Sequence, residues 1–182
     1  MVHRIHDCVD TLRRYYPDAD TDLVYKAYVF AAKMHGGQTR LSGEPYLSHP
    51  IEVAVTLANM KMDTITVATG LLHDVLEDTD TTLEQLTDLF GDEVAQLVDG
   101  VTKIEKIRFE SREEYQAENL RKMLLAMAKD IRVLLVRLAD RLHNVRTLNY
   151  ASEEQQKRVA QETLDIYAPL ANRLGLGLVK AE

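Results

Sequence analysis

The sequence has 182 residues, 46% of them hydrophobic, and carries a formal net charge of −7 at pH 7. This length fits one domain with a substantial core, and the acidic balance argues against broad binding to nucleic acids or anionic membranes. The single cysteine, Cys8, excludes an intrachain disulfide and fits a reducing cytosol. Neither a membrane-spanning apolar run nor a hydrophobic signal core is present, so we expect a cytoplasmic protein.

The hydrophobic pattern is helical almost throughout the chain. Leu23, Ala27, Phe30, Ala31 and Met34, for example, follow the spacing of one apolar stripe on a helix. We expect helices near residues 3–16, 21–35, 49–60, 64–78, 82–90, 92–106, 113–129, 130–148 and 152–173. The pattern therefore predicts an all-α single domain over residues 1–182, a helical bundle of about nine helices.

Local signals refine several of these boundaries. Capping boxes that begin at Thr81 and Ser152 each predict the start of a helix. Pro169 should kink or divide the last helix. Residues 131–136 could also form a strand, but the apolar spacing continues with a helical period to Leu142, so we prefer a helix.

Two segments interrupt the helical pattern. Residues 36–46 are rich in turn formers and polar groups, and residues 107–114 are charged and lack periodicity. Polar loops on a helical scaffold are common sites of ligand binding. We therefore expect the ligand to be contacted from such a segment.

The densest group of ionisable side chains lies in residues 73–78, His-Asp-Val-Leu-Glu-Asp. On a helix, Glu77 lies one turn from His73 and Asp74, and Asp78 lies one turn from Asp74. Three carboxylates and an imidazole this close are electrostatically costly unless a cation lies among them. A surface helix that leaves the acids in water is the alternative interpretation.

His49 and Asp140 could complete a metal site. His49 precedes Pro50 at an expected helix start, where a surface or capping role is the alternative. Asp140 lies on an otherwise apolar helix, where pairing with a neighbouring arginine is the alternative. Together with His73 and Asp74 they supply two imidazoles and two carboxylates. Such a mixed set leaves room for water and fits Mn²⁺ or Fe²⁺ better than structural zinc.

These residues resemble the H…HD…D signature of the HD superfamily: His49, the His73-Asp74 pair and Asp140. The surrounding sequence is similar to the successive motifs of the RelA/SpoT family hydrolase domain, in the same order. The matching stretches are residues 40–50, 73–79, 99–103, 138–148 and 167–175. Two positions depart from the family, because many relatives have a basic residue at Leu41 and histidine at Asn172.

The resemblance implies an HD-domain fold and hydrolysis of the guanosine tetra- and pentaphosphates ppGpp and pppGpp. This reaction removes the 3′-diphosphate, releases GDP or GTP and pyrophosphate, and ends the stringent response. The implied cofactor is Mn²⁺, ahead of Fe²⁺ or Zn²⁺, held by His49, His73, Asp74 and Asp140. It would lower the pKa of a bound water and polarise the 3′-linked phosphate. The implied partner is the small-molecule alarmone, without nucleic acid or membrane, and the oligomeric state is left open.

The resemblance also implies roles for residues around the metal. Glu77 and Asp78 would orient the water or move protons, with support of the histidine ligands as the alternative. Arg40 would contact phosphate or stack on guanine, unless it is only a surface charge. Ser42 would form a hydrogen bond to the base.

The helix that carries the aspartate ligand supplies further candidates. Asn144 and Thr147 follow that aspartate at i+4 and i+7, so they share its face and can reach the nucleoside. A helix-stabilising role remains the alternative for Thr147, and we interpret His143 as structural. Lys103 and Arg146 could contact distal phosphates or pair with nearby acids.

Two other functions remain open. The first is an HD phosphohydrolase that acts on another nucleotide, and the second is a regulatory domain that senses the alarmone without turnover. The presence of every proposed ligand favours an active hydrolase, because relatives specialised for synthesis have lost the HD pair. The sequence contains no synthetase motif, and it is consistent with either a standalone hydrolase or the N-terminal domain of a longer synthetase/hydrolase.

Overall fold

The computed structural model describes residues 3–105 and 129–176, and their regular structure is helical. In order, the helices are α1 (Ile5–Tyr15), α2 (Thr21–Met34), α3 (Ser48–Asn59), α4 (Thr64–Leu72), α5 (Val75–Asp78), α6 (Leu83–Phe90), α7 (Asp92–Glu105), α9 (Ile131–Arg146), η1 (Leu148–Tyr150), α10 (Glu153–Glu162), η2 (Thr163–Tyr167) and α11 (Ala168–Arg173). The all-α prediction is confirmed, and residues 131–136 are helical rather than extended. The expected helix at 113–129 and the irregular segment at 107–114 lie outside the described residues, apart from residue 129.

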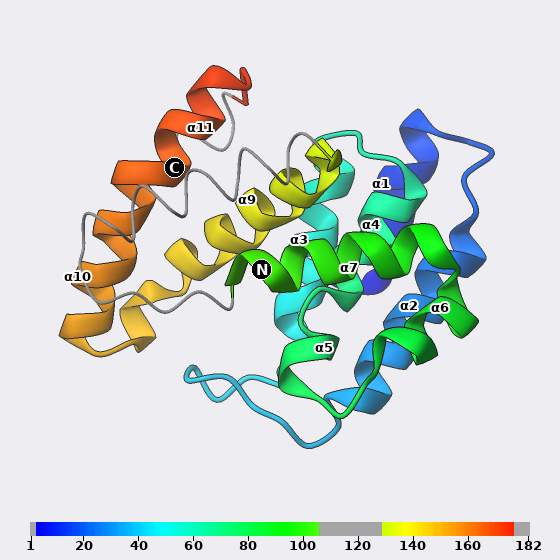
Figure 1. The fold of residues 1–182 in the computed structure, drawn as a ribbon, viewed down its shortest axis with the longest axis horizontal. Helices are drawn as coiled ribbons and strands as arrows, with labels where there is room; N and C mark the ends of the chain where they lie inside the picture. The colour runs from blue at the N-terminus through cyan, green and yellow to red at the C-terminus, as the bar shows by residue number, and fades with distance from the viewer. Residues whose placement is uncertain (1–2, 106–128, 177–182) are drawn as a thin grey trace.

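Helix α4 is the centre of the bundle and packs against α2, α3, α7 and α9 (Figure 1). Residues 66–72 are all buried, as expected for a helix that is apolar on every side. Gly70 allows α3 to approach closely, because a Cβ atom there would lie 2.6 Å from Leu57 Cδ1. This close packing brings the start of α3 near the end of α4.

Helix α9 is fixed against α7 and α4 near its N-terminus. Gly100 of α7 faces Val133, and a Cβ atom on this glycine would lie 2.9 Å from Val133 Cγ2. Arg132 forms ion pairs with Glu93 at 2.8 Å and with Asp63 at 3.4 Å. These contacts set the register of α9, and thus the position of the acidic residue on its later turns.

The expected helix at 64–78 is divided, which corrects one prediction. Helix α4 ends at Leu72, and α5 begins at Val75 after a turn formed by His73 and Asp74. On a continuous α-helix, adjacent side chains point about 100° apart. The interruption allows both side chains to reach one centre.

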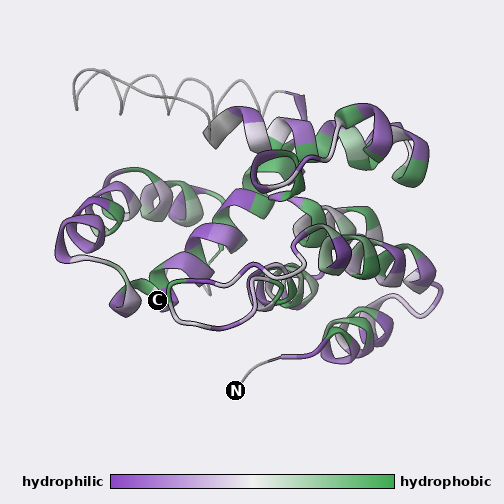
Figure 2. Cartoon of the chain, turned by 90° about the horizontal axis from the view of Figure 1, so that it is seen from below, coloured by the Kyte–Doolittle hydropathy of each residue, from purple (hydrophilic) through white to green (hydrophobic). Residues whose placement is uncertain are grey.

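Other boundaries follow the local signals closely. The capping box at Ser152 is present with Gln155, whereas the earlier one begins at Thr82, one residue later than expected. The last helix is divided as predicted: α10 continues into the π-helix η2, and Pro169 lies in the first turn of α11. In Figure 2 most helices carry both hydrophilic and hydrophobic residues, the pattern of helices that bury one face.

The 36–46 loop connects α2 to α3 and passes below α5 in Figure 1. Its two arms pair through hydrogen bonds from Arg40 N–H to Glu44 O and from Tyr46 N–H to Gln38 O. Gly43, at the turn between them, has a φ of 82°, a conformation that favours glycine. The loop is therefore a folded turn with its own backbone contacts.

A helix that spans a lipid bilayer needs about 20 mostly apolar residues. Within residues 3–105 and 129–176, no helix combines the length and the apolar character that crossing a membrane requires.

Candidate metal centre

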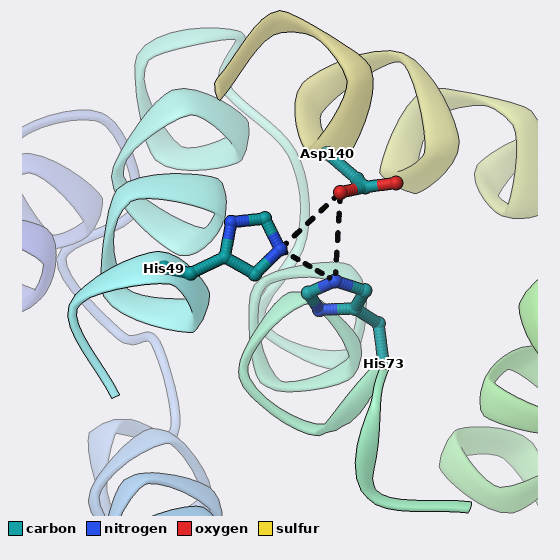
Figure 3. A group of neighbouring side chains, drawn as sticks. All are labelled: His49, His73 and Asp140. Atoms are coloured by element: carbon teal, nitrogen blue, oxygen red, sulfur yellow. Dashed lines mark hydrogen bonds and ion pairs between the residues drawn. The ribbon is translucent and has the colours of Figure 1, made fainter. Parts of the chain in front are cut away.

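The four proposed metal ligands come from three helical regions and meet inside the bundle. His49 lies in the first turn of α3, His73 and Asp74 form the α4–α5 junction, and Asp140 lies on α9. All four are buried, with exposed fractions of 2%, 1%, 9% and 5% in that order. We call these residues the His/Asp cluster, and Figure 3 shows three of them pointing toward one another.

The separations within the His/Asp cluster fit one bound cation. His49 Nε2 lies 3.2 Å from both His73 Nε2 and Asp140 Oδ1. Asp74 Oδ1 lies 2.9 Å from His73 Nε2, and Asp74 Oδ2 lies 3.5 Å from His49 Nε2. Ligands about 2.1 Å from a metal, at right angles to one another, are about 3 Å apart. His49, His73 and Asp140 therefore have donor types and spacings that fit a shared divalent cation, and Asp74 lies beside both histidines.

Both imidazoles are oriented by their second ring nitrogen. His73 Nδ1 donates a hydrogen bond to the carbonyl oxygen of Gly70 at 2.8 Å, which leaves the Nε2 lone pair free for the cluster. His49 Nδ1 lies 2.7 Å from Nδ1 of His143. When His49 donates in this contact, its Nε2 also presents a lone pair to the cluster. Such orientation of metal-binding histidines by an outer partner is the usual arrangement.

Burial and mutual interaction shift the pKa values of the His/Asp cluster. Burial lowers the pKa of His49 below its ordinary value. Burial also acts to lower the pKa of His73, but Asp74 and Asp140 outweigh it and raise this pKa to about 9. Burial acts to raise the pKa of both carboxyl groups, yet the adjacent histidines hold each pKa well below its usual range. Without a cation, a proton on His73 offsets one of the two carboxylate charges, and Arg137 pairs with Asp140.

Two neighbours on α9 fix the orientation of Asp140. Arg137 Nη1 donates to Asp140 Oδ2 at 3.0 Å, and Asn144 Nδ2 donates to Asp140 Oδ1 at 2.7 Å. The arginine is itself buried, with 5% of its surface exposed. The sequence analysis gave pairing with a neighbouring arginine as the alternative to metal binding by Asp140. The structure allows both, because the two carboxylate oxygens have different partners.

Helix α5 places the two proposed proton-handling residues directly after the cluster. Glu77 and Asp78 both donate a backbone N–H to the carbonyl oxygen of Asp74, at 3.1 and 2.9 Å. Glu77 Oε1 is buried. Asp78 Oδ2 lies 2.5 Å from the hydroxyl of Tyr46, and its carbonyl oxygen accepts a hydrogen bond from Gln38. Both residues thus remain close to the cluster although the helix is interrupted.

The structure separates the four proposed substrate-binding residues into two groups. Arg40 and Asn144 meet, because Arg40 Nη2 donates to Asn144 Oδ1 at 3.1 Å and so joins the 36–46 loop to α9. Ser42 instead donates to Glu44 within the loop. Thr147 donates its hydroxyl to the carbonyl oxygen of His143, the helix-stabilising contact that the sequence left as an alternative.

Sequence reasoning gave no site role to three residues that contact the proposed ligands: Tyr46, Arg137 and His143. Arg137 and His143 each lie three residues from Asp140, a spacing that places side chains on neighbouring parts of a helix surface. Burial, the neighbouring His49 and the charge on Arg40 lower the pKa of His143 to about 4, so this ring is neutral at physiological pH. No sequence spacing pointed to Tyr46, because its contacts are with residues of other elements that are distant in the sequence.

Lys103 and Arg146 are the two other basic residues for which the sequence suggested a contact with phosphate. Lys103 is exposed and pairs with Asp99 on the same helix, one of the two roles that the sequence left open. Arg146 ends α9, and its proposed contact with phosphate stays a prediction.

Comparison with known proteins shows where the chain belongs. Residues 27–177 match the family model described as HD domain. The chain is 62% identical over 175 residues to a Myxococcus xanthus GTP pyrophosphokinase, and 50% identical over 171 residues to the bifunctional (p)ppGpp synthase/hydrolase SpoT of Escherichia coli. Each match covers 94% of this chain but only 23% and 24% of the relative, so the chain spans about a quarter of their length.

A solved structure is similar to this chain over most of the length of both. It is that of a metazoan orthologue of SpoT that hydrolyses ppGpp and plays a role in starvation responses. The two chains superpose with a TM-score of 0.65 at 30% identity, covering 79% of this chain and 83% of the other. With its HD-domain match and its His/Asp cluster, of a kind that binds a divalent metal, the chain belongs to the RelA/SpoT family of HD-domain proteins.

Proposed function

We propose that residues 1–182 form an HD-type hydrolase domain that removes the 3′-diphosphate of ppGpp and pppGpp. The products are GDP or GTP and pyrophosphate, and the reaction ends the stringent response. The observation that carries this proposal is the buried convergence of His49, His73, Asp74 and Asp140 at 2.9 to 3.8 Å. Support for the substrate comes from the activities in the names of E. coli SpoT and the metazoan orthologue.

The cation proposed for the His/Asp cluster is Mn²⁺, ahead of Fe²⁺ or Zn²⁺. Two imidazole nitrogens and two carboxylates leave coordination positions for water and substrate, which a closed structural zinc site does not. When bound, the cation supplies Lewis acidity that makes water a better nucleophile and polarises a phosphoryl oxygen. The protein contributes the fixed orientation of both histidines and a buried setting that keeps charges from being screened.

Asp78 and Glu77 are proposed to handle protons. Their helix begins directly after the metal-binding junction, so both carboxylates are held on an element attached to the cluster. A carboxylate in this position orients the attacking water and accepts its proton, and the same group can return a proton to the leaving oxygen. Asp78 is held in a defined position, because both its side chain and its carbonyl oxygen are hydrogen-bonded.

The nucleotide is proposed to bind between the 36–46 loop and α9. Arg40 supplies a guanidinium that can contact a phosphate or stack on guanine, and it offsets part of the negative charge of the chain. Ser42 and Thr147 are proposed contacts to the base and the nucleoside. Asn144 already donates to Asp140 and accepts from Arg40, so substrate that engages Arg40 competes with this contact.

The curated relatives are about four times longer than this chain, and one of them is named as both synthase and hydrolase. We therefore propose that the chain corresponds to the N-terminal hydrolase part of such a synthetase/hydrolase. In this arrangement the metal cluster and the 36–46 loop would be sufficient for hydrolysis. Turnover by residues 1–182 alone is the expected result.

The test is a time course with purified protein, ppGpp and Mn²⁺, with nucleotides and pyrophosphate quantified separately. We expect equal amounts of GDP and pyrophosphate, and no products after the metal is removed with a chelator. Binding of ppGpp without any pyrophosphate at high protein concentration would instead identify a sensor domain and contradict the proposal. Parallel reactions with Fe²⁺ and Zn²⁺, and metal analysis of the purified protein, test the preference for Mn²⁺.

Substrate choice needs a separate control, because the alternative is an HD hydrolase for another nucleotide. We expect GTP, GDP and a guanosine with a single 3′-phosphate to be hydrolysed at least about a hundredfold more slowly than ppGpp, a barrier difference of about 2.7 kcal/mol. Comparable rates for these nucleotides would contradict alarmone specificity while leaving the metal-dependent hydrolase intact.

A further inference from the structure

Tyr46, the last residue of the 36–46 loop, places its hydroxyl between two acids of the proposed active site. The hydroxyl oxygen lies 2.7 Å from Asp74 Oδ2 and 2.5 Å from Asp78 Oδ2. Asp74 is a proposed metal ligand, and Asp78 is a proposed proton-handling residue. One phenol therefore joins the two functions of the site.

The ring of Tyr46 is held in a defined position by its neighbours. It stacks on His35, with 4.5 Å between the ring centroids and 18° between the planes, and it meets His49 edge to face at 6.2 Å. His35 is buried at the end of α2 and is itself bonded to Gln38 through Nδ1. Because two neighbours fix the ring, its hydroxyl has a defined position and can orient the acids that it contacts.

The chemistry of the phenol limits what it can do there. A tyrosine hydroxyl has an ordinary pKa of about 10, so it is protonated at neutral pH and can act as a donor to either acid. A phenol has a single proton and can donate it to only one of two carboxylates at a time. The acids thus share one donor.

We propose that Tyr46 is a positioning residue whose hydroxyl couples the metal-ligand carboxylate of Asp74 to the orientation of Asp78. The hydroxyl would hold the Asp74 carboxylate in its orientation as a metal ligand, and it would keep Asp78 close by for work on the attacking water. The 36–46 loop supports the same acid a second time, because Gln38 donates to the carbonyl oxygen of Asp78. The loop therefore prepares the catalytic acid in addition to contacting substrate. The inference rests on the proposed function of this site.

The test is Tyr46→Phe, which keeps the ring and its stacking on His35 but removes the hydroxyl. Loss of an outer hydrogen bond to a metal ligand typically costs about 10- to 100-fold in metal affinity or activity. We expect the Kd for Mn²⁺, measured by calorimetry without substrate, to rise about tenfold. At saturating Mn²⁺, kcat for ppGpp should fall at least about tenfold while KM changes less than about twofold.

The matched control is Tyr15→Phe. Tyr15 donates its hydroxyl to the carbonyl oxygen of Met62 at 2.6 Å, so this variant also removes a partly buried phenol hydrogen bond. We expect a similar loss of thermal stability from both variants, but unchanged Mn²⁺ affinity and kcat in the control.

These measurements distinguish an error in the role of Tyr46 from an error in the proposed function. If Tyr46→Phe keeps both the Mn²⁺ affinity and kcat of the unmodified protein, Tyr46 does not position the acids. A change in only one of the two quantities also contradicts the coupling, because the hydroxyl would then serve a single carboxylate. If the unmodified protein binds Mn²⁺ but never turns over ppGpp, the proposed function fails, and unchanged Mn²⁺ affinity in Tyr46→Phe is then sufficient to reject the contact with Asp74.

Discussion

The His/Asp cluster and the 36–46 loop differ in how the chain holds them. The cluster residues lie on or between packed helices and are at most 9% exposed, whereas Leu41 at the tip of the loop is 76% exposed. In the cluster each imidazole has a partner that fixes its orientation. The loop is stabilised mainly by its own backbone hydrogen bonds and reaches the cluster side through Gln38, Arg40 and Tyr46.

This difference separates the chemistry of the cluster from substrate recognition by the tip of the loop. A metal site needs ligand positions that persist through the reaction, and packed helices provide them. A loop with few buried contacts can adjust to a nucleotide and can change in sequence without loss of the core. Substitutions in the cluster should therefore affect metal binding and kcat, and substitutions at the loop tip should affect KM.

Asp74→Asn should give the largest effect. The amide keeps the shape of the side chain but removes the ligand charge, so the site loses both affinity for a divalent cation and activation of water. We expect turnover of ppGpp to fall at least about a thousandfold, or about 4 kcal/mol in the barrier. The measurement is product formation with time, together with metal content by mass spectrometry.

The control for this substitution is Asp88→Asn, at an exposed position on α6. It should retain the rate and metal content of the unmodified protein. A rate for Asp74→Asn within about tenfold of the unmodified protein, a difference of only about 1.4 kcal/mol, would show that the metal assignment is wrong.

Arg40→Ala should have the next largest effect and should act mainly on KM. A hydrogen bond to a charged group contributes about 1.5 to 3 kcal/mol, so kcat/KM should fall about 10- to 100-fold. Mn²⁺ affinity without substrate should stay within about twofold, because the hydrogen bond from Arg40 goes to Asn144 and not to a proposed metal ligand. Steady-state kinetics and calorimetry measure the two quantities, with the exposed Arg158→Ala as control. A loss confined to kcat would place Arg40 in the chemistry rather than in recognition.

The pH dependence of Mn²⁺ binding provides a third way to examine the cluster. His73 has a pKa of about 9 in the metal-free site and must lose its proton to bind a metal. Below that pKa, the apparent affinity should therefore rise about tenfold per pH unit, for example between pH 7 and pH 8. Burial lowers the pKa of His49, so this residue is neutral in the same range and adds no further dependence. Calorimetry in buffers of different ionisation enthalpy should detect about one proton released per ion. Affinity that is independent of pH in this range would contradict a protonated His73.

Leu41→Lys should give the smallest effect and the opposite sign. Leu41 is exposed beside Arg40, and a lysine there adds a second cation at the proposed phosphate-binding side. An exposed ion pair contributes about 0.2 to 1 kcal/mol, so KM for ppGpp should fall by no more than about fivefold with kcat unchanged. Repeating the kinetics at high salt should remove the gain. An unchanged KM at low salt would indicate that this part of the loop does not face the phosphates.

The amino-acid sequence was sufficient to predict most of the helices and to suggest the chemistry of the site. Helical periodicity and capping are local properties, so α2, α9 and the start of α10 could be predicted from neighbouring residues. The types of the four proposed ligands and their resemblance to a family motif pointed to one metal centre before any distance was known. The HD-domain match and the relatives then confirmed the family.

Tertiary structure alone decided how these residues meet. The division of the 64–78 helix at His73, the orientation of His49 by His143 and the position of Tyr46 between two acids depend on the packing of separate elements. Hydrophobic periodicity shows which face of a helix is buried, but it does not specify the partner of each polar group on that face. Those partners are selected by the close approach of α3 and α4 at Gly70 and by the register of α9. The sequence therefore predicted the proposed ligand set, whereas the folded chain determined which side chains contact the proposed ligands.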